Sequence, residues 1–385
     1  MVQKWLQCPD GPFTLAGYAG TGKTTLAKHF AAGVRGSVYF AAYTGKAAHV
    51  LSKAGCPNVS TIHRLIYSPA HKPATKLREL EEKLSSLRSR SPEPEAEIEK
   101  IQKAIKVEHE NLSRPAFQLN CESVLNSAAL LIVDEYSMID QQMGKDIMSF
   151  DVPVLALGDP GQLPPIRGEG YFGKPDIVLS QIHRQAEGNP IIDLATRARK
   201  GQELIPGTYG SSRVVRYSDI PAEELRSLVL GTDQLLVGRN ATRSSSNRRA
   251  RELLGRTSPF PEAGDKLVCL RNDSMTGLLN GSLWTCRENA TVVDDSQLLL
   301  AIESEDGACQ TVQAHRAYFE GGVPAFYEMR DAQCFDYGYA LTVHKSQGSQ
   351  WGNVLLFDEW HKEDRSNWLY TAITRAAESV TIVQM

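Results

Sequence analysis

The sequence lacks long apolar runs and lacks any closely spaced pair of cysteines. No apolar run approaches the roughly 18 residues that a membrane-spanning helix needs, and no apolar segment of signal-peptide type follows a basic N-terminus. The seven cysteines are odd in number and widely spaced, and none forms a Cys-x-x-Cys pair. A disulfide framework and a zinc ribbon are therefore not expected. These absences predict a protein without membrane contact in a reducing, cytoplasmic compartment.

Charges of both signs are present, but they are unevenly distributed along the 385 residues. Residues 1–68 hold seven Lys or Arg and one acidic residue, and residues 235–260 hold six Arg and one acidic residue. Residues 288–308 hold six acidic residues and no Lys or Arg. Two basic stretches in a chain of net charge −3 indicate either surfaces that bind a polyanion or a chance clustering of charges. Charge alone does not choose between these alternatives.

Short apolar runs alternate with helix-like stretches through most of the chain. The runs are Phe13–Ala16, Val38–Ala42, Ala129–Val133, Val152–Leu157, Leu235–Val237, Val354–Phe357 and Val380–Val383. Continuous apolarity, in place of alternation, indicates strands buried on both faces, as in parallel α/β sheets. A chain of this length is expected to form two or three domains. Ligands of parallel sheets bind at the carboxyl ends of the strands, so the residues after these runs are candidates for a site.

Two segments differ from the rest of the chain in their hydrophobic pattern and are predicted to be insertions. In residues 76–110, apolar residues recur at spacings of three and four, which places each of two sets on one helix face. The sets are Leu77, Leu80, Leu84 and Leu87, and then Ile98, Ile101 and Ile105. The prolines of Ser91–Pro94 separate them, so we expect an antiparallel helical hairpin. Residues 264–320 combine short strands with the turn signal Leu279-Asn280-Gly281 and predict a small β-rich unit.

The residues after the first apolar run match a phosphate-binding loop. Gly17–Thr24 fits G-x-x-x-x-G-K-[ST], and a helix-compatible stretch, Thr25–Phe30, follows it. Glycines allow backbone N–H groups to turn toward a β-phosphate at a helix N-terminus. Lys23 is expected to bridge the β- and γ-phosphates, and the Thr24 hydroxyl to ligate Mg²⁺. The residues predicted to bind the nucleotide here are Gly20, Thr21, Gly22, Lys23, Thr24 and Thr25.

Two carboxylates follow the apolar run at Ala129–Val133. We expect Asp134 to hold the Mg²⁺ shell, and Glu135 to orient and deprotonate an attacking water. A second acid favours hydrolysis over phosphoryl transfer to a bound alcohol, so the pattern predicts an NTPase. The sequence has no Asn-Lys-x-Asp stretch, which argues against a guanine-specific switch. A small-molecule kinase would not need the long second half of the chain.

Six further strings, in this order, resemble the motifs of superfamily-one helicases. They are Ala41–Ala48, Ser60–Leu65, Leu157–Pro165, Ile182–Gln185, Ala340–Gln350 and Leu369–Ala376. In the order of the motifs and in their residues, they are most similar to the RecD-like branch of that superfamily. The resemblance runs from about residue 13 to the C-terminus and is weak in residues 70–120 and 264–320.

This resemblance implies ATP bound with Mg²⁺ between two RecA-like domains, and single-stranded DNA crossing the top of both. The implied catalytic residues are Lys23, Glu135, Gln162, Arg184 and Arg375, with Arg375 reaching over from the second domain as an arginine finger. Gly348 and Gln350 are expected near the γ-phosphate and ribose. The implied DNA contacts are Thr44, Gly45 and His63 on the first domain, and Thr342, His344 and Lys345 on the second.

The expected fold class is α/β, with two RecA-like P-loop domains of parallel sheets and two insertions. The domain ranges are 1–69 with 119–200, the helical hairpin 70–118, 201–263 with 321–385, and the SH3-like unit 264–320. The hairpin is interpreted as a strand-separating pin, as a partner-docking arm, or as a solvated projection without a role of its own. The arginines of residues 239–256 are interpreted either as DNA contacts or as a solvated helix face.

The function that the resemblance implies is an ATP-dependent DNA helicase that moves 5′→3′ on single-stranded DNA and unwinds forked duplexes. A single-strand-stimulated ATPase that remodels protein–DNA complexes is the alternative within enzymes. A non-catalytic single-strand-binding protein is disfavoured by the presence of Lys23, Asp134, Glu135 and Arg375. Replication or recombination proteins are the partners that the family suggests, and a monomer is expected.

Overall fold

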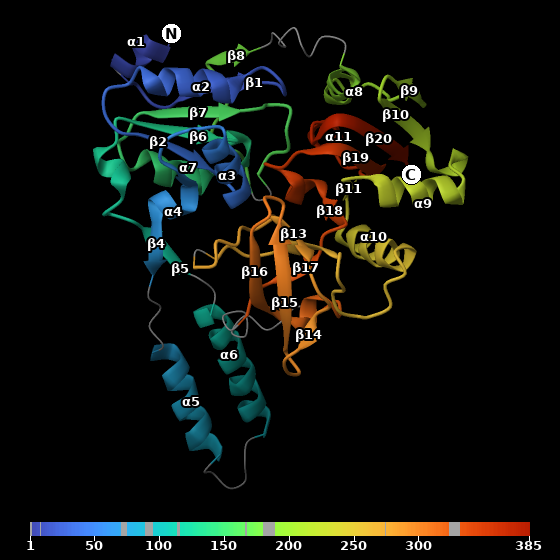
Figure 1. Ribbon diagram of the computed structural model, residues 1–385. Helices are drawn as coiled ribbons and strands as arrows, with labels where there is room; N and C mark the ends of the chain where they lie inside the picture. Colours follow the sequence, from blue (N-terminus) through green and yellow to red (C-terminus); the bar gives the residue numbers. More distant parts are fainter. Residues whose placement is uncertain are drawn as a thin grey trace.

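The computed structural model describes residues 2–7, 9–70, 75–88, 95–113, 116–165, 168–179, 189–273, 275–322 and 332–385. Within these residues the strands form three six-stranded sheets and one two-stranded ribbon. Two larger α/β domains lie beside each other, the third sheet lies below and between them, and a pair of helices projects beyond the ribbon (Figure 1). None of the described helices has the length and apolarity to cross a membrane.

The first sheet is parallel throughout. Its order is β3 (Val59–Thr61), β2 (Val38–Ala42), β6 (Leu130–Asp134), β7 (Val154–Gly158), β1 (Phe13–Gly17) and β8 (Ile177–Leu179). Its helices are α1 (Val2–Gln7), α2 (Lys23–Ala32), α3 (Gly45–Lys53), α4 (Ile62–Ile66) and α7 (Gln141–Met148). Apolar residues of α1, α2 and α3 share one core with this sheet, and those of α4 and α7 share a second. Helices therefore cover both faces, which explains the continuous apolar runs.

The second sheet has the same character. Its order is β18 (Ala340–Thr342), β11 (Gln234–Val237), β19 (Trp351–Asp358), β20 (Ala376–Gln384), β10 (Ser212–Arg216) and β9 (Gly207–Tyr209). All its pairs are parallel except that of β9 with β10. Its helices are α8 (Pro190–Arg199), α9 (Ala222–Gly231), α10 (Asn240–Leu253) and α11 (Arg365–Ile373). The fully buried Trp368 of α11 lies in the main core, which α8 completes.

The third sheet is antiparallel and forms the small β-rich unit. It consists of β12 (Lys266–Cys269), β13 (Leu283–Cys286), β14 (Thr291–Val292), β15 (Gln297–Ser304), β16 (Cys309–His315) and β17 (Phe335–Tyr337). β17 pairs with β12 although it lies after the range 264–320 expected for this unit. A strand of three residues carries too little periodicity to be recognised in a sequence. Short 3-10 turns, at Val124–Ser127, Tyr136–Met138, Tyr217–Asp219, Arg316–Tyr318 and Val343–Ser346, complete the described helical structure.

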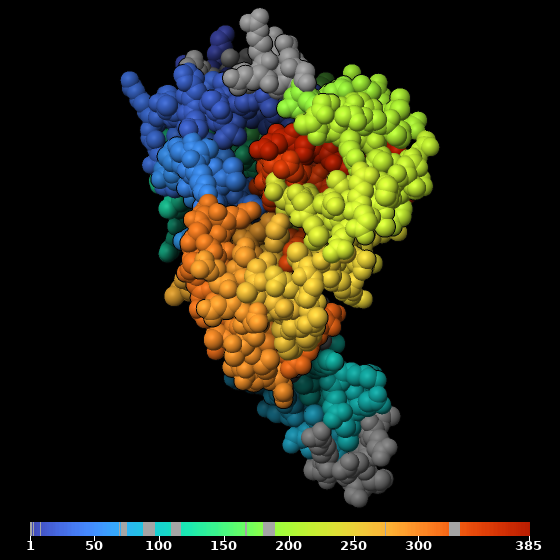
Figure 2. All heavy atoms as spheres, turned by 45° about the vertical axis from the view of Figure 1, so that its right-hand side comes forward, coloured from blue at the N-terminus to red at the C-terminus, as the bar shows by residue number. Residues whose placement is uncertain are grey.

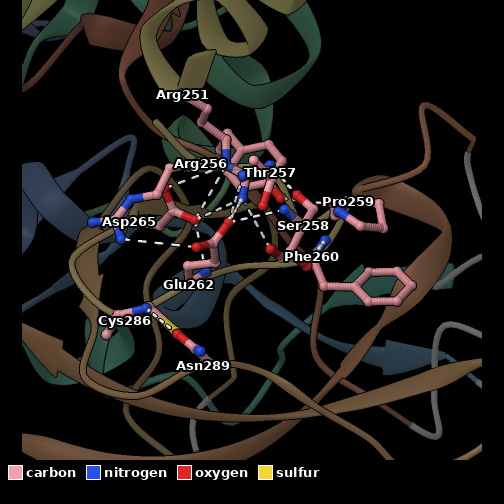
Figure 3. A network of polar contacts seen from close by, with 12 residues as sticks. Arg251, Arg256, Thr257, Ser258, Pro259, Phe260, Glu262, Asp265, Cys286 and Asn289 are labelled. Atoms are coloured by element: carbon pink, nitrogen blue, oxygen red, sulfur yellow. Dashed lines mark hydrogen bonds and ion pairs between the residues drawn. The ribbon is translucent and has the colours of Figure 1, made fainter. Parts of the chain in front are cut away.

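A buried arginine ties α10 to this unit (Figure 3). Arg251 is 7% exposed, and its Nε donates to both carboxylate oxygens of Asp265, at 3.3 and 3.2 Å. Its Nη1 and Nη2 donate to the carbonyls of Ser258 (2.8 Å) and Phe260 (3.0 Å). The guanidinium also lies over the ring of Tyr337, 4.4 Å from its centroid. Neither interpretation of the arginine cluster describes Arg251, which is a structural residue.

The helical hairpin stands on the two-stranded ribbon. β4 (Tyr67–Ala70) and β5 (Ala116–Leu119) are antiparallel, and α5 (Thr75–Arg88) and α6 (Glu95–Ser113) extend beyond them (Figure 1). Leu77 and Leu87 of α5 and Ile101 of α6 are buried, so the two predicted stripes face each other. The ion pair Lys76–Glu108 (2.8 Å) also joins the helices.

Candidate nucleotide site and nucleic-acid channel

The phosphate loop connects the buried strand β1 to the first turn of α2. Gly20 and Gly22 have φ angles of 78° and 77°, a left-handed conformation that favours glycine. The loop is tight, because a Cβ added to Gly17 would lie 2.5 Å from the Thr21 hydroxyl. Gly22 caps α2, so the free N–H groups of this helix begin where a phosphate would sit.

The Lys23 ammonium is held by its own loop. Its Nζ donates to the carbonyl oxygens of Gly17 (2.5 Å) and Tyr18 (3.2 Å). Thr24 is half-buried and Thr25 is exposed on the same turn. The ammonium therefore lies at the mouth of the loop, and a bound phosphate would compete for it with these two carbonyls.

Asp134 is the last residue of β6 and Glu135 follows it, so both carboxylates lie at the carboxyl end of this strand, as predicted. Burial and, to a lesser degree, the charge of Glu135 raise the pKa of Asp134 to about 6, although the Glu135 N–H and Lys23 act in the opposite direction. The Glu135 N–H donates to Asp134 Oδ1 at 2.9 Å. Glu135 itself has φ 58° and ψ 45°, a left-handed conformation that is costly for a residue with a side chain. Such strain is typical of functional sites.

Unsatisfied polar atoms near this edge allow a test of whether the residues fit a nucleotide with magnesium. Glu135 Oε2 and Gln162 Oε1 are buried, and neither has a hydrogen-bond partner among the described residues. Both are acceptors, which suit a water that donates to them. The Asp134 carboxylate and Thr24 hydroxyl are the hard oxygen ligands that Mg²⁺ prefers. The donor set therefore fits.

Tyr370 of α11 joins the second domain to this site. Its hydroxyl accepts from the Ala19 N–H of the phosphate loop (3.0 Å) and donates to Asp159 Oδ2 (2.6 Å). Burial raises the pKa of Asp159, although Lys23, Tyr370, Gly161 and Arg375 partly offset this. Asp159 is 2% exposed, so its contact with Tyr370 is shielded from water.

Other α11 side chains hold the loop after β7. The Asn367 amide donates to the carbonyls of Gly161 and Gln162, both at 3.1 Å, and the Thr371 hydroxyl accepts from the Leu163 N–H at 3.0 Å. Gln162 thus lies on a loop that touches both domains. A movement between the domains must change these contacts.

Arg375 follows α11 and is 7% exposed. Its Nε donates to the Thr371 carbonyl (3.0 Å) and its Nη1 to the Ser349 carbonyl (3.2 Å). Its charge is one of the effects that partly offset the raised pKa of Asp159. Arg184, the other arginine implied by the resemblance, lies outside the described residues.

Gly348 is packed against the first domain, whereas Gln350 is exposed. A Cβ added to Gly348 would lie 3.0 Å from Ala47 Cβ and 3.1 Å from the Thr44 hydroxyl, so Gly348 packs against the start of α3. Its φ of 74° requires glycine as well. Gln350 is exposed. The expected contacts of both residues with the nucleotide remain predictions.

Five of the six predicted DNA contacts line one cavity of about 440 Å³. Thr44, Gly45 and His63 line it from the first domain, and His344 and Lys345 line it from the second. Asn272 and Asn280 of the β-rich unit close it. Thr342 lines a neighbouring cavity, which also contains His344 and Lys345. Residues about 300 apart in the chain therefore form one channel, as their proposed common ligand requires.

A row of aromatic rings leads from this channel toward the helical hairpin. Successive centroids are 5.8 Å apart for Tyr43 and His63, 5.7 Å for His63 and Tyr67, and 6.3 Å for Tyr67 and Phe117. Phe117 lies on β5 and is 55% exposed. Partial burial lowers the pKa of His63, although Asp140 acts in the opposite direction, so the neutral imidazole is favoured. The rings are suited to bases, which stack regardless of sequence.

The β-rich unit contacts the first domain through charges. Lys46 pairs with Glu305 at 3.3 Å, His49 lies 3.1 Å from Asp306, and Lys53 also pairs with Asp306. Part of the basic N-terminal stretch therefore meets part of the acidic stretch across the channel, and the unit touches both larger domains (Figure 2). The two pairs with Asp306 are exposed, so each contributes little and salt weakens it.

Several of these contacts involve residues that are not among the site residues predicted from the motifs. Tyr370 and Tyr43 lie inside strings that resemble family motifs but have no predicted role, and Phe117 lies outside these strings. Only the ring positions in space identify them. The available signal was the placement of Tyr43 next to Thr44.

Comparisons with known proteins agree with this arrangement. The family model described as an AAA domain matches residues 1–216, and the UvrD-like helicase C-terminal domain matches residues 337–383. The chain is similar to the ATP-dependent RecD2 DNA helicase of Deinococcus radiodurans, with 29% identity over 94% of this chain and 46% of the relative. It thus spans less than half the length of the curated relatives that it matches.

Solved structures of Pif1 helicases share the fold. One, of two Pif1 helicases coordinating at forked duplex DNA, has a TM-score of 0.54 and 18% identity, covering 99% of this chain and 90% of that one. Bacteroides Pif1 bound to single-stranded DNA has a TM-score of 0.53 and 18% identity, covering 98% and 90%. The predicted fold class and the RecD-like resemblance are confirmed. Because the AAA domain model matches more than half of its residues, the chain belongs to the AAA domain family, and its architecture is that of RecD- and Pif1-like helicases.

Proposed function

We propose that this chain is an ATP-dependent DNA helicase that translocates on single-stranded DNA. One observation carries the proposal: Tyr370 bridges the phosphate loop and Asp159. The nucleotide site and the interface between the domains are therefore one structure. ATP binding must compete with contacts that position the second domain. The similarity to a RecD2 helicase supports the same function.

The chemistry assigned to the chain is hydrolysis of the γ-phosphate. Bound Mg²⁺ would be held by Thr24 and Asp134 and would neutralise phosphate charge. Glu135, whose buried Oε2 lacks a partner among the described residues, would accept the proton of the attacking water. Gln162 would hydrogen-bond near the γ-phosphate, and Arg375 would stabilise the charge that develops there.

Coupling to DNA follows from shared elements. The Gln347 amide donates to the Leu163 carbonyl at 3.4 Å, which joins the string that carries His344 and Lys345 to the loop that carries Gln162. Closure and opening of the nucleotide cleft would therefore shift the second-domain DNA contacts relative to Thr44 and Gly45. This is a translocation stroke of the hinge type.

Arg375→Ala should bind nucleotide but lose DNA-stimulated turnover, by about 10²-fold or more, because the guanidinium serves the transition state. The measurement is steady-state ATPase with single-stranded DNA, beside equilibrium binding of a fluorescent ATP analogue. Arg287→Ala, which removes an exposed arginine of the β-rich unit, is the control. Lost binding with normal turnover per bound ATP would make Arg375 a structural residue.

Single-strand affinity should fall with pH between 7 and 9. Burial, reinforced by the charge of Arg243, lowers the pKa of Lys345 to about 8, although Asp336 and Cys269 act in the opposite direction. A phosphate contact needs the protonated amine, so deprotonation above pH 8 should weaken binding up to about tenfold by pH 9. Titrations of a labelled oligonucleotide would measure this. Lys345→Arg should flatten the profile, and an equally steep profile in that variant would contradict the assignment.

Direction and unwinding need a separate experiment. Polarity 5′→3′ is proposed from the RecD-like resemblance. ATPase with and without single-stranded DNA, followed by unwinding of forks with a 5′ or a 3′ tail, tests the whole proposal. Stimulated ATPase with unwinding of the 5′-tailed substrate supports it. Stimulation without unwinding of either substrate would favour a translocase that remodels protein–DNA complexes, and ATPase that ignores DNA would reject both.

A further inference from the structure

A second cavity, of about 840 Å³, continues the channel across the second domain. It shares His344 and Lys345 with the first cavity, and Pro164 and Pro165 of the first domain form part of its wall. Trp360 also lines it. The DNA contacts assigned above to the second domain are polar side chains that suit phosphates, so none of them explains an indole at this place.

The Trp360 ring is fixed in one orientation. It stacks on the fully buried Trp368, with centroids 5.9 Å apart and planes inclined by 9°. Its Nε1 donates to Asp364 Oδ1 at 2.7 Å. Gly238 packs closely against it, because a Cβ added there would lie 3.1 Å from Trp360 Cε3. The plane is thus held before any ligand arrives, which reduces the entropy lost on binding.

An exposed cation lies over the ring. Lys362 is exposed, and its ammonium lies 4.5 Å from the Trp360 ring centroid. Within the described residues Lys362, Lys345 and Arg239 form no ion pair. The nearby Glu359 carboxylate is already engaged, since it accepts from the Gly238 N–H (2.8 Å) and the Arg239 N–H (3.1 Å). The cavity therefore offers an aromatic plane beside unpaired positive charges.

We propose that Trp360 is a stacking platform for one base of the single strand, with Lys362 moving from the ring to an adjacent phosphate when the base enters. The inference rests on the proposed function and assigns it a base-binding site on the second domain. A nucleotide matches this cavity because it joins an aromatic plane to an anion. Stacking on an indole accepts every base, as a translocating protein requires.

The test compares an oligothymidylate with an abasic oligonucleotide of equal length, by fluorescence anisotropy without nucleotide. The wild-type chain should prefer the strand with bases. In Trp360→Leu that preference should shrink at least about fivefold, the lower end for one base–aromatic contact, while abasic affinity is kept. Trp360→Phe should retain most of the preference. Tyr217→Leu, which removes a half-exposed aromatic elsewhere on this domain, is the matched control and should equal wild type.

A Trp360→Leu preference equal to that of wild type would overturn the proposal, as would equal loss of affinity for both strands. Lys362→Ala provides a second, independent test of the proposal, which remains possible if Trp360→Leu is unstable. The slope of log affinity against log salt should become shallower by about 0.7 for the strand with bases, because one phosphate contact is lost. An unchanged slope would reject the Lys362 movement. Wild-type binding without DNA-stimulated ATPase would reject the proposed function instead, and the base preference would still be measurable.

Discussion

Glu135→Gln should bind ATP and single-stranded DNA but hydrolyse ATP about 10²- to 10⁴-fold more slowly than wild type. An amide cannot accept the proton of the attacking water, and general-base catalysis contributes an effect of this size. The substitution keeps the side-chain volume and the left-handed backbone at this position. Single-turnover hydrolysis, beside equilibrium binding of a fluorescent ATP analogue, would measure both properties.

A second variant of the nucleotide site and a matched control accompany this experiment. Lys23→Ala should also abolish hydrolysis, because it removes the ammonium that the phosphate loop holds beside the expected phosphate position. Glu122→Gln, at an exposed position of the same domain, should keep wild-type turnover and is the matched control. Substantial turnover by Glu135→Gln would show that another group activates the water.

Replacing residues 75–113 with a short Gly/Ser linker should spare DNA-stimulated ATPase but cripple the unwinding of forks. Translocation on one strand does not part a duplex unless a rigid element stands at the fork. The two helices are about 20 and 28 Å long at 1.5 Å per residue, and their buried Leu and Ile stripes make them stiff. The aromatic row ends at Phe117, at the base of this hairpin.

The ribbon makes this deletion practicable. Ala70 and Ala116 are paired at the end of β4 and β5, so a short turn can join them without moving either strand. A second variant, Leu87→Ser with Ile101→Ser, keeps the length but separates the helices, and it should lose unwinding to a similar degree. For each protein, the rate of fork unwinding is compared with the rate of DNA-stimulated ATP hydrolysis. Unwinding at the wild-type rate by the truncated chain would move a partner-docking role ahead of strand separation.

Local sequence determined the parts of this protein whose chemistry depends on neighbours in the chain. The phosphate loop is recognisable because glycine φ angles, a lysine and a helix start must lie within eight residues. Asp134 and Glu135 follow a strand whose continuous apolarity marks it as buried. The hairpin was predicted because two stripes of period 3.6 can bury each other without the main core. Fold class follows from the same alternation of strands and helices.

How these parts meet depends on the packing of segments that are distant in the chain. Tyr370 reaches Ala19 across 351 residues, and Arg251 is buried against Asp265 although the arginine cluster had been expected to contact DNA or solvent. Trp360 is a candidate base platform only because Trp368 and Gly238 hold it at the wall of a cavity. The physical reason is common to all three. A contact between distant segments depends on how whole sheets pack, and local periodicity carries no record of that packing.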